Sequence, residues 1–93
     1  MILHVAIGFK EKTVPHAVIQ NRAFSGMGWA RYSPNCWVVQ LTKSPKEISD
    51  EIRKLVSTAD SIFVCEVNLK NNGGYLSPEV WKWINLRIAE SKA

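Results

Sequence analysis

One short segment constrains the fold more than any other, because it fixes the start of a helix at a single residue. Ser44-Pro45-Lys46-Glu47 places a hydroxyl at the N-cap, proline at the first helical position and a carboxylate three residues after the cap. This is a capping box, in which the Ser and Glu side chains satisfy backbone amides that a helix start leaves free. Helical spacing then relates Ile48, Ile52, Leu55, Val56 and Ala59. We predict an amphipathic helix whose apolar stripe, through Ala59, packs on a sheet.

Two apolar runs, far apart in the chain, predict the central strands of that sheet. Residues 2 to 9 (ILHVAIGF) are rich in β-branched side chains and read as a strand buried largely on both faces. The run Ile62 to Cys65 within SIFVCEVNL is again apolar on both faces. We expect these two strands to lie side by side.

The region between them predicts a helix and a hairpin. Val14, Ala17, Val18 and Phe24 have helical spacing, with Thr13 as N-cap ahead of Pro15. Gly26 and Gly28 then break the chain, and the strand-like runs MGWARY and NCWVVQL are separated by the turn dipeptide Ser33-Pro34. We predict an antiparallel hairpin whose large side chains are Trp29, Tyr32, Trp37, Val39 and Leu41.

The order of elements predicts the fold class. A last helix is expected from about 78 to 90, because Ser77-Pro78-Glu79 repeats the device of cap, proline and acid. Strand, helix, hairpin, helix, strand is the order of a ferredoxin-like β-α-β-β-α-β sandwich of α+β class, here with an additional C-terminal helix. With 93 residues we expect a single domain over 1–93: a core at 1–69, a loop at 70–76 and the C-terminal helix at 77–90.

The N-terminal sequence, the length of the apolar runs and the cysteine positions predict a cytoplasmic protein. The first residues lack the layout of a secretory signal, and no apolar run is long enough to cross a bilayer, so we expect no membrane association. Cys36 and Cys65 fall in separate strand-like runs, which indicates buried small side chains rather than a metal knuckle. A disulfide between neighbouring strands is the alternative, and it requires an oxidising compartment.

The charge balance favours weak attraction to nucleic acid or another acidic partner, since the net charge is +4 and the pI about 9.3. Trp29 and Tyr32 offer stacking surface near cationic side chains. The opposing interpretation is a set of solvated cations around a buried aromatic hairpin. The predicted nucleic-acid-binding residues are Lys10, Lys12, Arg22, Trp29, Arg31, Lys43 and Lys70.

No catalytic residue, metal site or cofactor is predicted. His4 and His16 have no Asp, Cys or Ser at a spacing that would form a nucleophile or metal site. Glu66 shares a strand face with Ile62 and Val64, and an inward carboxylate there needs a cationic partner. A structural ion pair with Arg22, Arg31 or His4 is expected, and a catalytic acid with raised pKa is the alternative.

The last helix carries more apolar surface than one stripe can hold. Val80, Trp81, Ile84 and Ile88 share a stripe, whereas Trp83 and Leu86 lie on another face. Trp83 either folds onto the hairpin or a loop, or meets a partner subunit, which makes Trp83 and Leu86 the predicted protein interface.

Three segments together carry a family resemblance: GWARYSPNCWVVQLTKSPKEISDEIRKLV, DSIFVCEV and the helix Ser-Pro-Glu-Val-Trp-Lys-Trp-Ile. They resemble small ferredoxin-like proteins related to the CRISPR-associated adaptation subunit that partners the spacer integrase, including stand-alone SinR-type relatives. The similarity covers about residues 28 to 90 and consists mostly of core patterning. It implies a homodimer that contacts nucleic acid or a nucleic-acid-processing protein complex.

The chain departs from that family where nuclease activity would reside. The family's metal-dependent activity rests on an Asp at the end of the first strand, whereas this strand ends Ile7-Gly8-Phe9-Lys10 and the nearest acid is Glu11. Without paired carboxylates no Mg²⁺ is held against a phosphate. We therefore expect a non-catalytic binding module. The alternatives are a divergent metal-dependent nuclease or endoribonuclease using Glu11 or Glu66, and an inhibitor or scaffold that acts through the C-terminal helix.

Overall fold

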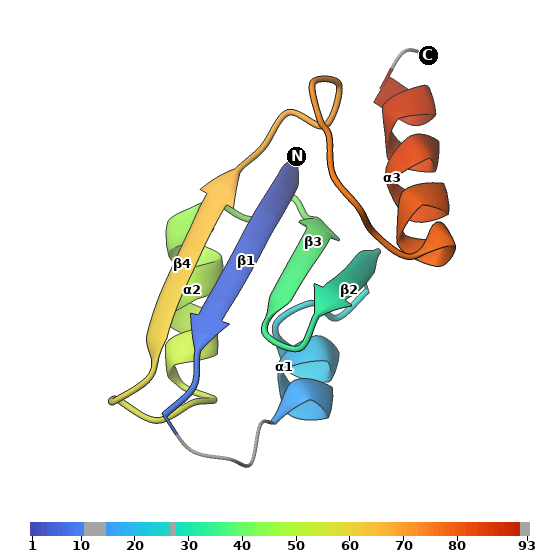
Figure 1. Cartoon of the computed structure of the whole chain (residues 1–93). Helices are drawn as coiled ribbons and strands as arrows, with labels where there is room; N and C mark the ends of the chain where they lie inside the picture. The colour runs from blue at the N-terminus through green and yellow to red at the C-terminus, as the bar shows by residue number, and fades with distance from the viewer. Residues whose placement is uncertain (11–14, 27, 92–93) are drawn as a thin grey trace.

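A computed structural model describes residues 1–10, 15–26 and 28–91 as a small α+β protein with a four-stranded antiparallel sheet and three helices (Figure 1). The strands lie in the order β2-β3-β1-β4, and every neighbouring pair is antiparallel. The strands are β1 (Ile2–Gly8), β2 (Trp29–Ser33), β3 (Cys36–Gln40) and β4 (Ser61–Glu66). The helices are α1 (His16–Arg22), α2 (Pro45–Arg53) and α3 (Pro78–Ser91). The predicted α+β class, hairpin and C-terminal helix are confirmed.

β1 is the central strand, as predicted, and it pairs with β4. Val5 lies opposite Trp37 of β3 on one side and Val64 of β4 on the other. The expected burial on both faces is wrong, because only alternate residues of β1 are fully buried. β4 is likewise exposed on its second face, where the Phe63 side chain is 65% exposed. The reason is that β4 is the last strand of the sheet and helices α1 and α2 cover a single face of it.

That covered face holds the main hydrophobic core. Alternate side chains of β1 and β3 meet α1 and α2 there, and Trp37 is fully buried with its indole Nε1 donating to Gln20 Oε1 at 3.1 Å. The buried set comprises Leu3, Val5, Ile7, Ile19, Ala23, Phe24, Trp37, Val39, Leu41, Ile48 and Ile52. Burial of this contiguous apolar set is the dominant favourable contribution to folding.

The other face of the sheet is covered in part by α3. Val38, which lies between core residues of β3 and therefore points to the opposite side, packs with Val80 and Ile84 of α3. Ala30 and Tyr32 of β2 border this second cluster. Figure 1 shows α3 beside β2 and away from β4, so α3 does not cover the half of this face that β1 and β4 form.

α2 begins as predicted but ends earlier. The Ser44 hydroxyl accepts from the Glu47 amide at 3.2 Å, and the Glu47 carboxylate accepts from the Ser44 amide at 3.4 Å, which is the expected capping box. The predicted stripe is confirmed for Ile48, Ile52, Leu55 and Val56, which lie in or against the core. It is wrong for Ala59, because the helix ends at Arg53 and Ala59 is exposed. Arg53 donates to the carbonyls of Ser57 at 2.7 Å and Asp60 at 2.8 Å, and these bonds hold the chain in a turn.

α1 is short, and its buried face differs from the prediction. Ile19, Ala23 and Phe24 are buried, whereas Ala17 and Val18 are exposed. The helical spacing counted from Val14 placed the buried side of α1 incorrectly. A helix of seven residues is too short for the spacing of apolar residues to distinguish its buried side from its exposed side. Thr13 and Val14 lie outside the described residues, and the N-cap observed is Pro15, without a side-chain hydrogen bond.

Within the described residues, none of the helices combines the length and apolar character needed to cross a membrane.

Candidate functional site

The end of the sheet where β1 begins gathers several of the predicted binding residues; we call it the basic end. Ile2 lies opposite Gln40 at the end of β3, and Leu3 lies opposite Glu66 at the end of β4. Trp29, at the start of β2, lies opposite Val39 at the same end. Lys43 and Lys70, which follow β3 and β4 within a few residues, are therefore brought toward this end.

The other predicted nucleic-acid-binding residues are dispersed. Lys10 follows the opposite end of β1, where its backbone amide donates to the buried Asp60 carboxylate at 2.9 Å. Arg31 lies opposite Trp37 in the middle of β2, and its side chain is exposed. Arg22 ends α1 and lines a groove together with Glu51 of α2 and Lys54, which follows that helix. Lys12 lies outside the described residues.

Two residues at the basic end differ in how available they are. Lys43 is held by Glu51, with Nζ to Oε1 at 2.6 Å, so its charge is already partnered. Trp29 is 37% exposed and shares its sheet face with Val39 on the α1 side of β2. It is an accessible aromatic surface at the sheet edge.

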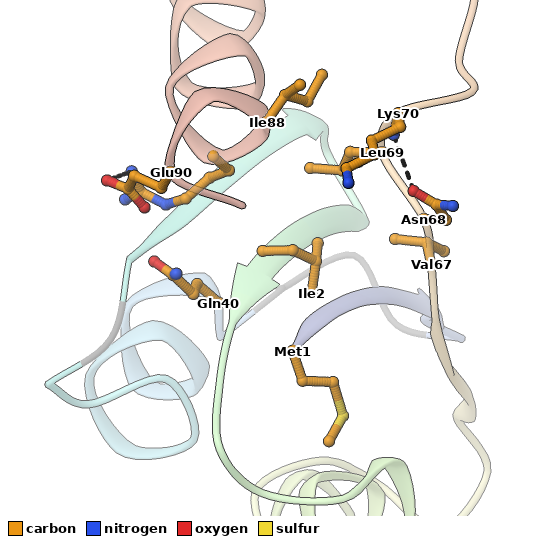
Figure 2. Close-up of a pocket in the computed structure, with 10 residues that line it drawn as sticks. Met1, Ile2, Gln40, Val67, Asn68, Leu69, Lys70, Ile88 and Glu90 are labelled. Carbon is orange, nitrogen blue, oxygen red and sulfur yellow. Dashed lines mark hydrogen bonds and ion pairs between the residues drawn. The ribbon is translucent and has the colours of Figure 1, made fainter. Parts of the chain in front are cut away.

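A pocket of about 310 Å³ lies at the basic end, between the strand ends and α3. Figure 2 shows Ile88 of α3 and Leu69 of the segment after β4 on two sides of it, with Ile2 and Gln40 of the strands below. Its polar side chains are Gln40, Asn68, Lys70, Arg87 and Glu90. Apolar walls with a few converging polar groups are typical of small-ligand sites, and this volume lies at the small end of their range.

Arg87 supplies the least exposed charge of the pocket. Its side chain is only 17% exposed, and its guanidinium carbon lies 4.5 Å from the centre of the Trp83 ring. Nη1 reaches Glu90 Oε1 at 3.4 Å, a long contact, and Nε is buried without a hydrogen-bond partner among the described residues. A buried N–H donor without a hydrogen-bond partner lowers the stability of the folded protein unless an acceptor binds to it. The site therefore has hydrogen-bonding capacity for an anion.

Gly28, just before β2, allows the guanidinium to occupy this position. A Cβ at Gly28 would lie 2.5 Å from Arg87 Nη2, closer than nonbonded atoms approach. The Gly28 carbonyl also accepts from the Gln40 amide at 2.8 Å, which anchors it to the strand end. Any side chain at position 28 would displace the guanidinium from the pocket.

A second polar group lies on the sheet face opposite the main core. His4 Nε2 and the Tyr32 hydroxyl are 2.5 Å apart. Burial lowers the pKa of His4, and burial together with the hydrogen bond to Cys36 raises the pKa of Tyr32 to about 12. Both side chains are therefore neutral at pH 7. His4 has the half-buried, hydrogen-bonded structural role expected from the sequence.

Neither cysteine is cross-linked. Cys36 lies opposite Ala6 on one side of β1, and Cys65 lies opposite His4 on the other. Because β1 separates them, they are not on neighbouring strands, and both are half-buried free thiols.

Glu66 does not have the inward position that the sequence predicted. Its side chain is exposed at the end of the edge strand β4, so it needs no buried cationic partner. Over the described ranges, which omit Glu11, no three His, Cys, Asp or Glu side chains cluster as metal ligands.

The predicted protein-interface residues have different surroundings. Trp83 is half-buried among the side chains around Val80 and Ile84, with its indole under Arg87. Leu86 is exposed on α3. Their role in binding another subunit stays a prediction.

Comparisons with protein families, with curated proteins and with solved structures find no match for this chain. Its function must be argued from its own residues. Arg87 and Gly28 were missing from the sequence prediction, although Trp83 and Arg87 have the i, i+4 spacing at which helical side chains meet.

Proposed function

We propose that this protein is a non-catalytic nucleic-acid-binding module of ferredoxin-like architecture, which contacts a single strand through the basic end of its sheet. The observation that carries the proposal is that Lys70 and the largely buried Arg87 line one pocket, while the exposed ring of Trp29 lies at the same end of the sheet on its other face. Cationic side chains track phosphates, and an aromatic face stacks on a base whatever its sequence.

The ferredoxin-like assignment is supported by chain order and sheet order together. The elements before Val67 run strand, helix, hairpin, helix, strand, and β1 lies between β3 and β4. The first two helices share one face of the sheet. α3 is then an addition on the opposite face.

A binding role is favoured over catalysis by the state of the polar groups. Glu66 is exposed at the end of an edge strand, where its carboxylate faces solvent rather than an enclosed cleft. His4 is held neutral against Tyr32 and borders no described carboxylate. The pocket cation Arg87 carries a guanidinium, which has hydrogen-bond donors and no acceptor and therefore suits anion binding.

The direct test is the binding of fluorescein-labelled single-stranded RNA and DNA, followed by anisotropy over a range of salt concentrations. We expect weak binding that falls steeply with salt, and the log–log slope should decrease by about 1 in Lys70→Gln. Trp29→Ala should weaken binding by about 1 to 3 kcal/mol through lost stacking. Lys54→Gln, which removes an exposed lysine just after α2 that does not line the pocket, should bind like the parent.

Two results would reject this function. One is binding that does not respond to salt or to Lys70→Gln. The other is strand cleavage that requires Mg²⁺ and stops with EDTA, which would revive the nuclease alternative. In that event, a Glu66→Gln variant that keeps full cleavage would exclude Glu66 as its acid.

The proposal includes a cytoplasmic homodimer that associates through the outer face of α3. Leu86 is exposed and borders a shallow groove with Trp81, and burial of such apolar surface favours association. Light scattering after gel filtration should give twice the chain mass, and Leu86→Asp should return it to the monomer. A parent protein that is monomeric at high micromolar concentration excludes the dimer but leaves the nucleic-acid test intact.

A further inference from the structure

We infer that the pocket at the basic end is a site for a phosphate monoester, either the terminal phosphate of a nucleic-acid strand or that of a free nucleotide. The inference deepens the proposed function, because it assigns the charged end of the ligand to one cavity. Both ligands present the same chemical group, a dianionic phosphate attached to an organic molecule.

Within the described part of the chain, the Arg87 guanidinium lacks acceptors for part of its hydrogen-bonding capacity. A guanidinium carries five N–H donors and no acceptor. In this structure Nη1 has a 3.4 Å contact with Glu90, Nε has no partner among the described residues, and the side chain is mostly buried. Arginine presents its donors as a planar fork that matches two oxygens of a phosphate or carboxylate. A bound oxyanion would supply the acceptors.

The neighbours of Arg87 hold the guanidinium in place rather than neutralise it. Trp83 lies beneath it at 4.5 Å, an arrangement that fixes the plane of the cation without consuming a donor. Gly28 leaves space for Nη2 on the strand side. Among the described residues, Glu90 is the single carboxylate that lines the pocket, and its side chain is 56% exposed, so solvent screens its repulsion of an anion.

The remaining lining suits a small organic phosphate better than a bare ion. Lys70 adds a second positive charge at the rim, and the amides of Gln40 and Asn68 add neutral polar groups. Ile2, Leu69 and Ile88 provide apolar wall that a sugar or base can cover (Figure 2). A phosphate monoester carries more negative charge than a diester within a strand, so two cations favour a terminal phosphate.

The test compares adenosine 5′-monophosphate, adenosine and inorganic phosphate, titrated into ¹⁵N-labelled protein at constant ionic strength and followed by NMR. We expect the nucleotide to shift the amide resonances of Gln40, Asn68 and Leu69, with inorganic phosphate weaker and adenosine without effect. Arg87→Gln should weaken nucleotide binding about tenfold, as expected for the loss of charge-assisted hydrogen bonds.

Gly28→Ala is the sharper variant, because it acts on geometry alone. The added methyl would meet the flexible end of Arg87, so the guanidinium must move while the backbone need not. We expect about fivefold weaker nucleotide binding with an unchanged melting temperature. Lys54→Gln, which removes the positive charge of an exposed lysine just after α2 that does not line the pocket, should bind the nucleotide like the parent.

A pair of oligonucleotides, one with a 5′-phosphate and one with a 5′-hydroxyl, distinguishes the two sources. Preference for the phosphorylated strand, lost in Gly28→Ala, identifies the strand end as the ligand. Nucleotide binding without any oligonucleotide binding identifies a free nucleotide and defeats the proposed function while the pocket assignment stands.

The inference is overturned if adenosine binds as well as its monophosphate, or if Arg87→Gln and Gly28→Ala bind the nucleotide as tightly as the parent. Salt-dependent oligonucleotide binding without a terminal-phosphate preference and without nucleotide binding would also overturn it, and would leave the proposed function in place.

Discussion

The two faces of the sheet are built in different ways. On the face that carries α1 and α2, the central side chains of β1 and β3 are fully buried and apolar, and the polar atom of Trp37 is matched to Gln20. On the face that carries α3, the buried apolar cluster is small, and it is bordered by Tyr32, Trp83 and the incompletely bonded Arg87. The first face accounts for most of the stability, and the second presents groups to a ligand.

This difference shows how a small protein can combine stability with binding capacity. A close-packed core accepts no polar group without a partner, so a site with unused donors must lie where solvent or a ligand can reach it. Placing α3 over only part of the second face creates such a place without opening the main core.

The largest effect is expected from Ile52→Ala in α2. Ile52 is fully buried in the main core, and a truncation there leaves a cavity that the packed helices and strands cannot close. The free energy of unfolding should fall by about 3 to 4 kcal/mol, measured by urea denaturation. A loss below about 1 kcal/mol would contradict a close-packed first face.

The same change in α3, Ile84→Ala, should cost less, about 2 kcal/mol, because its cluster is smaller and borders solvent. Hydrogen exchange should show faster exchange in α3, with protection of β1 and β3 retained. If Ile84→Ala costs as much as Ile52→Ala, or if all amides lose protection together, the two faces form a single cooperative unit.

The helix caps offer a milder comparison between the faces. Ser44→Ala removes a reciprocal capping box from α2, whereas Ser77→Ala removes one long bond, 3.4 Å from the Val80 amide, from α3. We expect losses of about 1 kcal/mol and about 0.5 kcal/mol respectively, by chemical denaturation. A larger loss for Ser77→Ala would mean that α3 contributes more to folding than its packing indicates.

The smallest effect concerns pH and is confined to the α3 face. Burial lowers the pKa of His4 below 6.5, so the unfolded chain binds the proton more readily and stability decreases as pH falls through 6.5. The pKa of Tyr32 is raised from 10.0 to about 12, so its stabilisation is lost as pH rises above 10. Urea midpoints measured from pH 5 to pH 8 should flatten in His4→Gln. An unchanged slope would exclude His4 as the source.

Local patterns in the sequence predicted most of the secondary structure. The start of α2 after Ser44, the hairpin and the start of α3 after Ser77 follow from short-range chemistry of caps and turns, although the hairpin turn lies at Pro34-Asn35, one residue later than predicted. The errors have physical causes as well. The end of α2 depends on Arg53 bonding beyond the helix, and the position of Glu66 depends on β4 being an edge strand.

The candidate site could be predicted only in part. Lys70 and Trp29 follow from their place at strand ends, but the gathering of Lys70 and Arg87 around one pocket required the packing of α3 against the hairpin. The sequence predicted only that Gly28 interrupts the chain before the hairpin. In the structure, its lack of a side chain also leaves room for the Arg87 guanidinium.

By itself, the sequence determined where α2 and α3 begin, which alternate residues are apolar, and that β1 and β4 are neighbours. Those properties depend on residues a few positions apart or on the need of apolar strands to be buried. The tertiary structure alone decided that an arginine from the last helix lies against a glycine before β2 and lines a pocket together with Ile2 of β1. Contacts across such separations depend on how the layers pack, which no short-range pattern specifies.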